Sequence, residues 1–409
     1  MKDIEILRCS NPYCKATAKD PQRGKFILSN TECKGGLIKK GTLTCHTCDA
    51  KYFIKDGIPN LLPEKIRKCL EGKAKKNELS EFDRFIIDGI QWSGKMVPSY
   101  HENVVDPFSS AFGPRYIERY EDLYIDGVMD KYIKIAKEKT IFIEMGVGTG
   151  RYLIRYGART TNSEVKKKRK HPLAPFQRHL KSKVCKAYRE DSTLNRYYSY
   201  DKDYDYNLQL IVGIDFQKSM IDKCIKILKE MKLNQLIGRR ILLLIAAAQY
   251  FNLALDQAEE YKNSFKVVTC AFQTLGNQPK DLQIDLLKTL KTLASPKGKI
   301  IVSIFNRERF FDFGINRFYR TDVAPTVGKV REDKEAIRLR DEGILTTDRG
   351  VYSKWFYEEE LEKLFKVAGL DATVKNYKHL SVFPKDADYL SIEDQRDVMR
   401  TLIIAETEL

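Results

Sequence analysis

Short apolar runs alternate with helical patterns along the chain from about residue 139 onward. Each run is short enough to be one buried strand, and the segments after several of them carry apolar residues at helical spacing. Strands that alternate with helices predict a parallel α/β sheet with crossover connections. The strand-like runs span residues 141–144, 208–214, 241–248, 265–272 and 299–305, and the clearest helical patterns span residues 217–232 and 282–293.

The pattern before residue 139 is different. Residues 63–95 are charged and helix-prone, with a strongly basic stretch at 65–76, and residues 99–137 place tyrosine and aliphatic residues at helical spacing. We therefore expect helices there that pack on the following domain. The predicted organisation is a small cysteine-rich domain at 1–62, a linker with N-terminal helices at 63–138, and an α/β domain at 139–409 with insertions at about 158–205 and 306–349.

Composition sets limits on these predictions. The 409 residues are 43% hydrophobic, which is ample for a sizeable core and excludes wholesale disorder. The longest apolar run, 241–248, is far shorter than the ~20 residues that span a bilayer, and the N-terminus lacks the apolar region of a signal peptide. We expect a cytoplasmic protein with no membrane contact. The 72 Lys and Arg against 56 Asp and Glu give a net charge of +16, which favours an acidic partner such as nucleic acid.

Nine cysteines without a secretory signal favour metal binding or burial over disulfides, and five of them fall in the first 48 residues. Cys45 and Cys48 form a C-x2-C turn, and Cys9 and Cys14 form a looser C-x4-C turn. Four thiolates on two short turns provide the closed tetrahedral shell that structural Zn²⁺ prefers. Cys33 is an alternative ligand, and a ribbon without metal is the remaining alternative.

The sequence 33–37, the Cys45–Cys48 turn and the segment 52–62 together resemble small zinc ribbons. Such ribbons occur as activator subunits of RNA and release-factor methyltransferases and at the front of rRNA guanine methyltransferases. The resemblance implies that Cys33 is a ligand. We favour Cys9, Cys14, Cys45 and Cys48, because both pairs then lie on short turns.

A glycine turn follows the first buried strand. Gly146, Gly148 and Gly150 lie between that strand and a helix-prone segment, where the absence of Cβ atoms lets the backbone approach a ligand. Glu144 closes the strand, and Asp215 closes the next one, where a carboxylate can accept both hydroxyls of a ribose. No Lys-Ser/Thr follows the turn, so it is not a Walker phosphate loop, but a dinucleotide-binding dehydrogenase would share these features.

Five stretches in a fixed order resemble class I S-adenosylmethionine-dependent methyltransferases. The resemblance spans roughly residues 139–380 and implies a Rossmann-like, doubly wound, mostly parallel seven-stranded sheet, preceded here by the zinc ribbon, with S-adenosyl-L-methionine as cofactor. The stretches are residues 141–152 (motif I), 212–220 (motif II), 265–272, 296–302, and 355–361 with 368–370.

The resemblance also implies roles for individual residues. Glu144 and the three turn glycines would hold the methionine part of the cofactor, or Glu144 would only cap local amides. Asp215 would hold the ribose, or act as a helix N-cap, with Phe216 or Met220 beside the adenine. The family usually has Asp-Ala after the third strand, where this chain has Ala247, Ala248 and Gln249. Gln249 or backbone groups would then contact the adenine, or the adenine contact would be looser.

The methyl acceptor is less defined. Family analogy puts it near Gln273, Thr274 and Asn277, although Asn277 is equally suited to cap a helix. Methyl transfer needs alignment more than a fixed acid and base, so no catalytic residue is predicted. The basic insertion at 158–190 suits RNA phosphates or is a solvated charge run. The first hypothesis is therefore an RNA methyltransferase acting on rRNA or tRNA. The alternatives are a methyltransferase of a small molecule or protein, with the ribbon as a structural or docking module, and a non-enzymatic RNA-binding protein.

Overall fold

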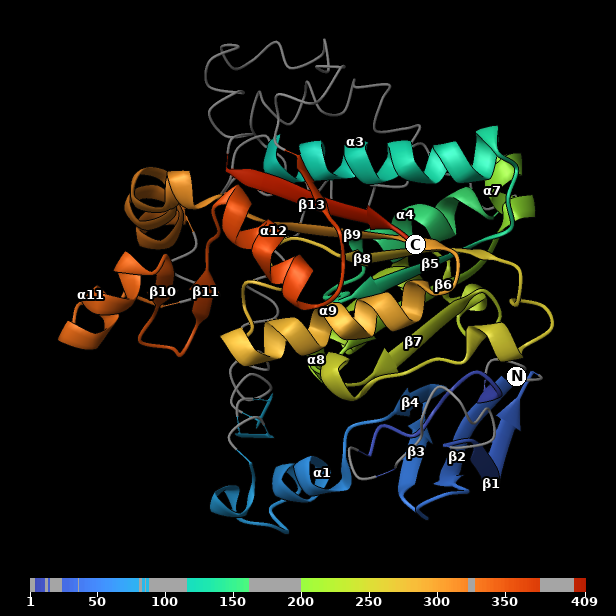
Figure 1. Ribbon diagram of the computed structural model, residues 1–409. Helices are drawn as coiled ribbons and strands as arrows, with labels where there is room; N and C mark the ends of the chain where they lie inside the picture. Colours follow the sequence, from blue (N-terminus) through green and yellow to red (C-terminus); the bar gives the residue numbers. More distant parts are fainter. Residues whose placement is uncertain are drawn as a thin grey trace.

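A computed structural model of the chain has one large mixed sheet with helices on both faces (Figure 1). The structure describes residues 4–11, 14, 24–35, 37–80, 83–84, 86–87, 116–161, 200–322, 328–375 and 401–409. Most of the predicted basic arm at 158–190 lies outside the described residues. Within the described residues, no helix has both the length and the apolar character needed to cross a membrane.

The large sheet has 11 strands in the order β1-β2-β3-β4-β7-β6-β5-β8-β9-β13-β12. Strands β5 to β9 are mutually parallel, and β13 lies antiparallel between β9 and β12. The strands are β1 (Phe26–Lys34), β2 (Leu37–Cys45), β3 (Lys51–Lys55), β4 (Ile58–Asn60), β5 (Thr140–Met145), β6 (Leu208–Asp215), β7 (Ile241–Ile245), β8 (Phe265–Cys270), β9 (Gly298–Phe305), β12 (Thr373–Lys375) and β13 (Leu402–Glu408), and a separate hairpin pairs β10 (Ile344–Thr346) with β11 (Tyr352–Lys354).

Helices cover both faces of the parallel strands. Buried residues of α3, α4 and α8 belong to one apolar cluster, and those of α9 and α12 belong to another. The α-helices are α1 (Glu64–Leu70), α3 (Tyr116–Asp130), α4 (Arg151–Arg159), α7 (Lys202–Asn207), α8 (Lys218–Glu230), α9 (Lys280–Ala294), α11 (Lys334–Asp341) and α12 (Glu358–Val367). Shorter or wider helical turns are η2 (Lys76–Glu78), η5 (Lys131–Ile135), η8 (Asn234–Leu236), η9 (Ala248–Tyr250), η10 (Leu255–Gln257), η11 (Arg307–Arg309) and η12 (Phe310–Asp322).

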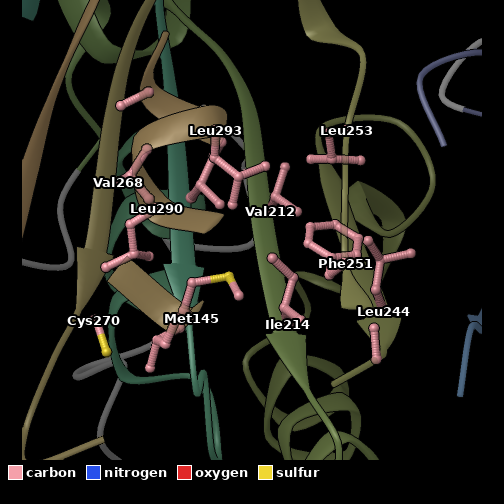
Figure 2. Packing of buried hydrophobic residues seen from close by; sticks show 14 of the residues in the cluster. Met145, Val212, Ile214, Leu244, Phe251, Leu253, Val268, Cys270, Leu290 and Leu293 are labelled. Carbon is pink, nitrogen blue, oxygen red and sulfur yellow. The ribbon is translucent and has the colours of Figure 1, made fainter. Parts of the chain in front are cut away.

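The central strands are apolar on both faces, which explains their continuous hydrophobic runs. Every residue of β5, β7 and β8 is buried, as expected for parallel strands covered by helices on two sides. Figure 2 shows part of the packing on the α9 face, where Leu290 and Leu293 of that helix lie near Val268 and Val212. The predicted α/β sheet with crossovers is confirmed.

The predicted number of seven strands is wrong for the sheet as a whole. Seven strands, β5 to β9 with β12 and β13, form the doubly wound part, and the four strands of the cysteine-rich segment extend it at β7. Asn60 of β4 pairs with Ile245 of β7, and the Leu61 N–H donates to the Ile245 carbonyl at 2.7 Å. Without the ribbon, β7 would be a sheet edge with unpaired backbone groups. Residues 60 and 61 pair with Ile245 at this edge, so the ribbon strands continue the sheet.

The winding changes direction between β5 and β8. From β5 the chain proceeds to β6 and β7 on one side through α4 and α8, and from β8 it proceeds to β9 on the other side through α9. In open α/β sheets, ligands bind in the crevice at the carboxyl ends of the strands at such a switch point. The turn after β5 and the turn after β8 therefore form the two walls of a candidate crevice.

Candidate functional site

Four cysteines from separate segments converge near the N-terminus. The Sγ atoms of Cys9, Cys14, Cys45 and Cys48 all lie within 4.8 Å of one another. Cys45 ends β2, and Cys48 lies in the turn before β3. Cys33 is exposed near the end of β1 and does not belong to this group. The structure thus brings together the four cysteines that their spacing favoured.

The geometry of this cluster suits a tetrahedral metal. The Cys9–Cys48 and Cys14–Cys45 Sγ distances are both 3.7 Å. A zinc ion with Zn–S bonds of about 2.3 Å would separate its sulfur ligands by about 3.8 Å. Backbone N–H groups of Asn11 and Thr47 donate to the Sγ atoms of Cys9 and Cys45, each at 3.4 Å. Four thiolates and no fifth ligand among the described residues correspond to a structural site rather than a catalytic one.

The glycine turn after β5 is fixed to the neighbouring strand β6. Backbone N–H groups of Gly146 and Val147 both donate to the Ile214 carbonyl, at 2.9 and 3.0 Å. All three turn glycines have positive φ angles, of 73° at Gly146, 53° at Gly148 and 90° at Gly150. A residue with a Cβ is strained in that region, so the local backbone requires glycine.

The three glycines differ in what surrounds them. A Cβ added at Gly146 would lie 2.4 Å from Thr274 Cγ2, and one at Gly150 would lie 2.3 Å from Cys224 Sγ. A Cβ added at Gly148 would meet nothing within 4 Å among the described residues. Packing therefore requires the outer two glycines, whereas the middle one faces open space in which a ligand can approach the backbone.

Asp215 holds this turn from the end of β6. Its Oδ2 accepts from the Gly148 N–H at 2.9 Å, and its Oδ1 accepts from the Gln217 N–H at 2.9 Å. Burial raises the pKa of Asp215 to about 6, although these backbone donors oppose the shift. A carboxylate oxygen can accept two hydrogen bonds. The Phe216 backbone is a third donor to this carboxylate, which leaves an acceptor position for a ligand hydroxyl.

Glu144 is a buried carboxylate at the end of β5. Its side chain is 4% exposed, and its Oε2 has no hydrogen-bond partner among the described residues. Burial raises the pKa of Glu144 well above its usual value, and the nearby charges of Asp122 and Asp215 raise it further. An orphaned carboxylate oxygen in an acidic setting would be satisfied by a cationic group of a ligand and would repel an anionic one.

The remaining predicted cofactor residues follow β6 and β7. Met220 is buried, and Phe216 is half-buried against the apolar cluster that also contains Val147 of the glycine turn. Ala248 and Gln249 begin η9, and the Gln249 amide donates to Gln278 Oε1 at 3.2 Å. The structure thus places the predicted ribose, adenine and methionine contacts on three neighbouring strand ends, β5, β6 and β7.

The turn after β8 forms the opposite wall. Phe272 and Gln273 have positive φ angles of 47° and 66°, and two consecutive residues with side chains in that region are a strained arrangement of the kind that clusters at functional sites. The Gln273 amide donates to the Lys354 carbonyl at 2.8 Å, and its Oε1 accepts from the Phe305 N–H at 2.8 Å. Thr274 packs against Gly146 and donates to the Ala271 carbonyl at 2.7 Å. Asn277 is exposed.

A buried ionic ladder between α3 and α4 was not predicted from the sequence. Acidic residues of α3 alternate with Arg151, Arg155 and Arg159 of α4, at N–O distances that include 2.9 Å for Arg155–Asp122 and 3.2 Å for Arg159–Asp126. The hydroxyls of Tyr152 and Tyr156 donate to acids of the same ladder. The four-residue spacing of the arginines and of Asp122, Asp126 and Asp130 was the available signal.

No protein-family model matches the chain, and no curated protein does. Solved structures that resemble it include an S-adenosylmethionine-dependent methyltransferase from Clostridium acetobutylicum, at 10% identity and a TM-score of 0.37, covering 77% of this chain and 98% of that one. The CcbJ methyltransferase from Streptomyces caelestis has 15% identity and a TM-score of 0.38, covering 75% and 96%. A Burkholderia thailandensis 1,6-didemethyltoxoflavin-N1-methyltransferase with bound S-adenosylhomocysteine has 11% identity and a TM-score of 0.36, covering 82% and 90%. At identities and TM-scores this low these are likenesses only, and function must be inferred from the chain's own residues.

Proposed function

We propose that the chain is an S-adenosyl-L-methionine-dependent methyltransferase whose cofactor lies over the Gly146–Gly150 turn. The observation that carries the proposal is the charge around the open face of Gly148. Asp215 is hydrogen-bonded to the Gly148 N–H, and the orphaned carboxylate of Glu144 closes the same strand as the turn. This acidic setting favours a cofactor with a sulfonium and an ammonium group over one that places a pyrophosphate on the turn.

The roles of Asp215 and Glu144 are inferred from the acceptor positions that their carboxylates have left for a ligand. The carboxylate of Asp215 accepts from the backbone at Gly148, Gln217 and Phe216, which leaves an acceptor site for a ribose hydroxyl. The unpartnered Oε2 of Glu144 would accept from the ammonium group of the methionine part. Phe216 and Met220 would pack against the adenine, and Gln249 would offer its side-chain amide at the ring edge.

The bound cofactor would supply an activated methyl group on sulfur, and the protein would orient the acceptor and exclude water. The wall after β8 suits this task. Gln273 ties that turn to the segment 353–354 and to the end of β9. The β10–β11 hairpin, which contains residues 353–354, therefore braces the turn that would orient the acceptor.

A turn held this firmly suits a small-molecule acceptor, or a single side chain of a protein. An RNA acceptor remains the alternative prediction, and it depends on the basic arm at 158–190, most of which lies outside the described residues. Retention of the protein on total RNA at low ionic strength, lost as salt rises, would favour the RNA alternative. Equal elution at both salt concentrations would favour the small acceptor.

We also propose that Cys9, Cys14, Cys45 and Cys48 bind a structural Zn²⁺ ion. The proposal is supported by the two 3.7 Å sulfur–sulfur distances and by the closed, all-thiolate donor set. The site lies in the ribbon and not in the crevice, so the ion would stabilise the fold without taking part in methyl transfer.

The experiment that tests the function is transfer of a labelled methyl group from S-adenosylmethionine to fractionated cell extract. The wild type should label one fraction, and Asp215→Ala should reduce the labelling at least about 100-fold through loss of cofactor binding. A wild-type protein that labels no fraction although it is folded would contradict the proposal.

A further inference from the structure

Glu121 of α3 lies at the end of the ionic ladder nearest the crevice. Its side chain is fully buried and contacts four donors from three segments. One oxygen accepts from the Phe272 N–H at 2.8 Å and from the Ser303 hydroxyl. The other accepts from the Tyr152 hydroxyl at 3.2 Å and pairs with Arg151.

Three of these donors belong to the two walls of the crevice, and the fourth, Ser303, lies on β9, which pairs with β8. Arg151 and Tyr152 begin α4, directly after the glycine turn, whereas Phe272 begins the strained turn after β8. The Arg151 guanidinium also lies 5.8 Å from the centre of the Phe272 ring. A single carboxylate thus joins the proposed cofactor wall to the proposed acceptor wall.

The contact with Phe272 helps to hold that residue in its strained, left-handed conformation. A left-handed φ is sterically unfavourable at a phenylalanine and persists only where its surroundings enforce it. The Phe272 N–H is shared between Glu121 at 2.8 Å and the Ser303 hydroxyl at 2.7 Å. Since that hydroxyl donates its own hydrogen to Glu121, the carboxylate also fixes the direction in which Ser303 accepts.

We propose that Glu121 is a positioning residue, which holds the Phe272–Thr274 turn in register with the glycine turn so that acceptor and cofactor align. The proposal rests on the proposed function for its effect on methyl transfer, but the positioning itself can be measured without an acceptor. Glu121 is too buried to touch either substrate, so it acts through the backbone of Phe272.

The test compares Glu121→Gln with Asp126→Asn. The amide that replaces the carboxylate in Glu121→Gln has the size of glutamate but only one acceptor atom, so it could satisfy only one of the two walls. Asp126 is a matched control because it is also a buried ladder carboxylate, bonded to Arg159 at 3.2 Å and to the Tyr156 hydroxyl at 3.1 Å. These partners lie in α4 but outside both walls.

The first readout is amide hydrogen exchange in the peptide that spans residues 271–275. Glu121→Gln should speed this exchange at least about tenfold, since a lost bond worth about 1.4 kcal/mol corresponds to that factor, whereas Asp126→Asn should leave it at the wild-type rate. Should Glu121→Gln not fold, Ser303→Ala gives a milder change of the same contact and should speed exchange in the same peptide. Wild-type exchange in the variant that folds would overturn the proposal.

The second readout is labelled methyl transfer to cell extract. Glu121→Gln should lower the rate at saturating cofactor about 100-fold, as a misalignment near ~1 Å does, while the KM for the cofactor changes less than about threefold. A rate loss no larger than that of Asp126→Asn would overturn the role in the reaction. A wild type that transfers no label would contradict the proposed function, and the exchange result would still decide whether Glu121 holds the turn.

Discussion

The cysteine ribbon and the parallel strands belong to one sheet, yet they are held together differently. Every residue of β5 is buried, whereas most of β1 is exposed. The few buried apolar residues of the ribbon, such as Leu43, Tyr52 and Ile54, lie beside its sulfur cluster and join the cluster of the parallel strands. A segment this small rarely folds on apolar burial alone and needs a staple such as a metal. The ribbon should therefore respond to changes at its thiols and the crevice to changes in its packing.

The largest expected effect is the loss of the metal from the ribbon. Cys45→Ser should abolish tight zinc binding, since a structural zinc site contributes on the order of 10 kcal/mol to folding. Zinc content measured by mass spectrometry should fall from one ion per chain to none. Cys33→Ser is the matched control and should keep the zinc, because Cys33 is exposed and outside the cluster.

The same variant tests whether loss of zinc from the ribbon changes ligand binding at the crevice. Affinity of Cys45→Ser for S-adenosylhomocysteine should stay within about threefold of the wild type, because β5, β6 and β8 pair with no ribbon strand. Titration calorimetry measures this. A loss of affinity as large as the loss of zinc would show that the two regions are not independent.

Two glycines of the crevice should then separate packing from binding. Gly150→Ala should destabilise the fold by about 3 kcal/mol, because the new methyl group would overlap Cys224 Sγ. Gly148→Ala should cost only about 1–2 kcal/mol from its left-handed φ, yet weaken S-adenosylhomocysteine more than about tenfold by occupying the open space. Denaturant unfolding and calorimetry measure the two effects. If Gly148→Ala lost no more affinity than Gly150→Ala for the same loss of stability, a ligand at Gly148 would be excluded.

Removal of the Asp215 carboxylate should weaken cofactor binding and change the fold less than the glycine substitutions do. Asp215→Asn should reduce affinity for S-adenosylhomocysteine about 30- to 100-fold, since charge-assisted hydrogen bonds are worth about 1.5–3 kcal/mol each. Asp222→Asn on the exposed face of α8 is the control, because its pair with Lys218 is solvent-exposed and contributes little. Unchanged affinity in Asp215→Asn would exclude a ribose at this position.

The smallest effect is a pH dependence. Since the pKa of Asp215 is raised to about 6 in the folded protein, its ionised form is lost as pH falls below about 6. Affinity for S-adenosylhomocysteine should then fall up to about tenfold per pH unit. The folded protein also binds this proton more tightly than the unfolded chain, whose aspartates titrate near ~3.9. Asp215 therefore favours folding at low pH, and that contribution is lost as pH rises from about 4 to 6.

Asp215→Asn provides the reference for that linkage. The stability of the wild type relative to Asp215→Asn should decrease between about pH 4 and 6, in contrast to the usual gain from paired carboxylates. Unfolding measured across this range tests the sign. A difference that stays constant with pH would mean that the pKa of Asp215 is not raised.

The cofactor wall could be predicted from the sequence because its residues lie in short, contiguous patterns. The glycine turn, Glu144 and Asp215 follow strands whose apolar runs are plain in the sequence. The four clustered cysteines could likewise be found from their spacing. Their assignment to cofactor and metal remains a prediction.

The acceptor wall could not be predicted, because it depends on contacts between segments far apart in the chain. Nothing in the sequence near Phe272 indicates that Glu121 accepts its N–H, or that Gln273 is bonded to residues 305 and 354. The union of ribbon and core also escaped prediction, since it depends on backbone bonds at Asn60 and Leu61 that leave no side-chain pattern.

The proposed function requires that the glycine turn bind a cationic sulfonium cofactor rather than a dinucleotide. Calorimetric titration of the wild type with S-adenosylmethionine and, separately, with NAD⁺ tests it most directly. We predict one S-adenosylmethionine per chain and no heat with NAD⁺, because the buried, unpartnered Oε2 of Glu144 can accept from the ammonium group of the former, and the latter has no such group. Binding of NAD⁺ without binding of S-adenosylmethionine would contradict the account.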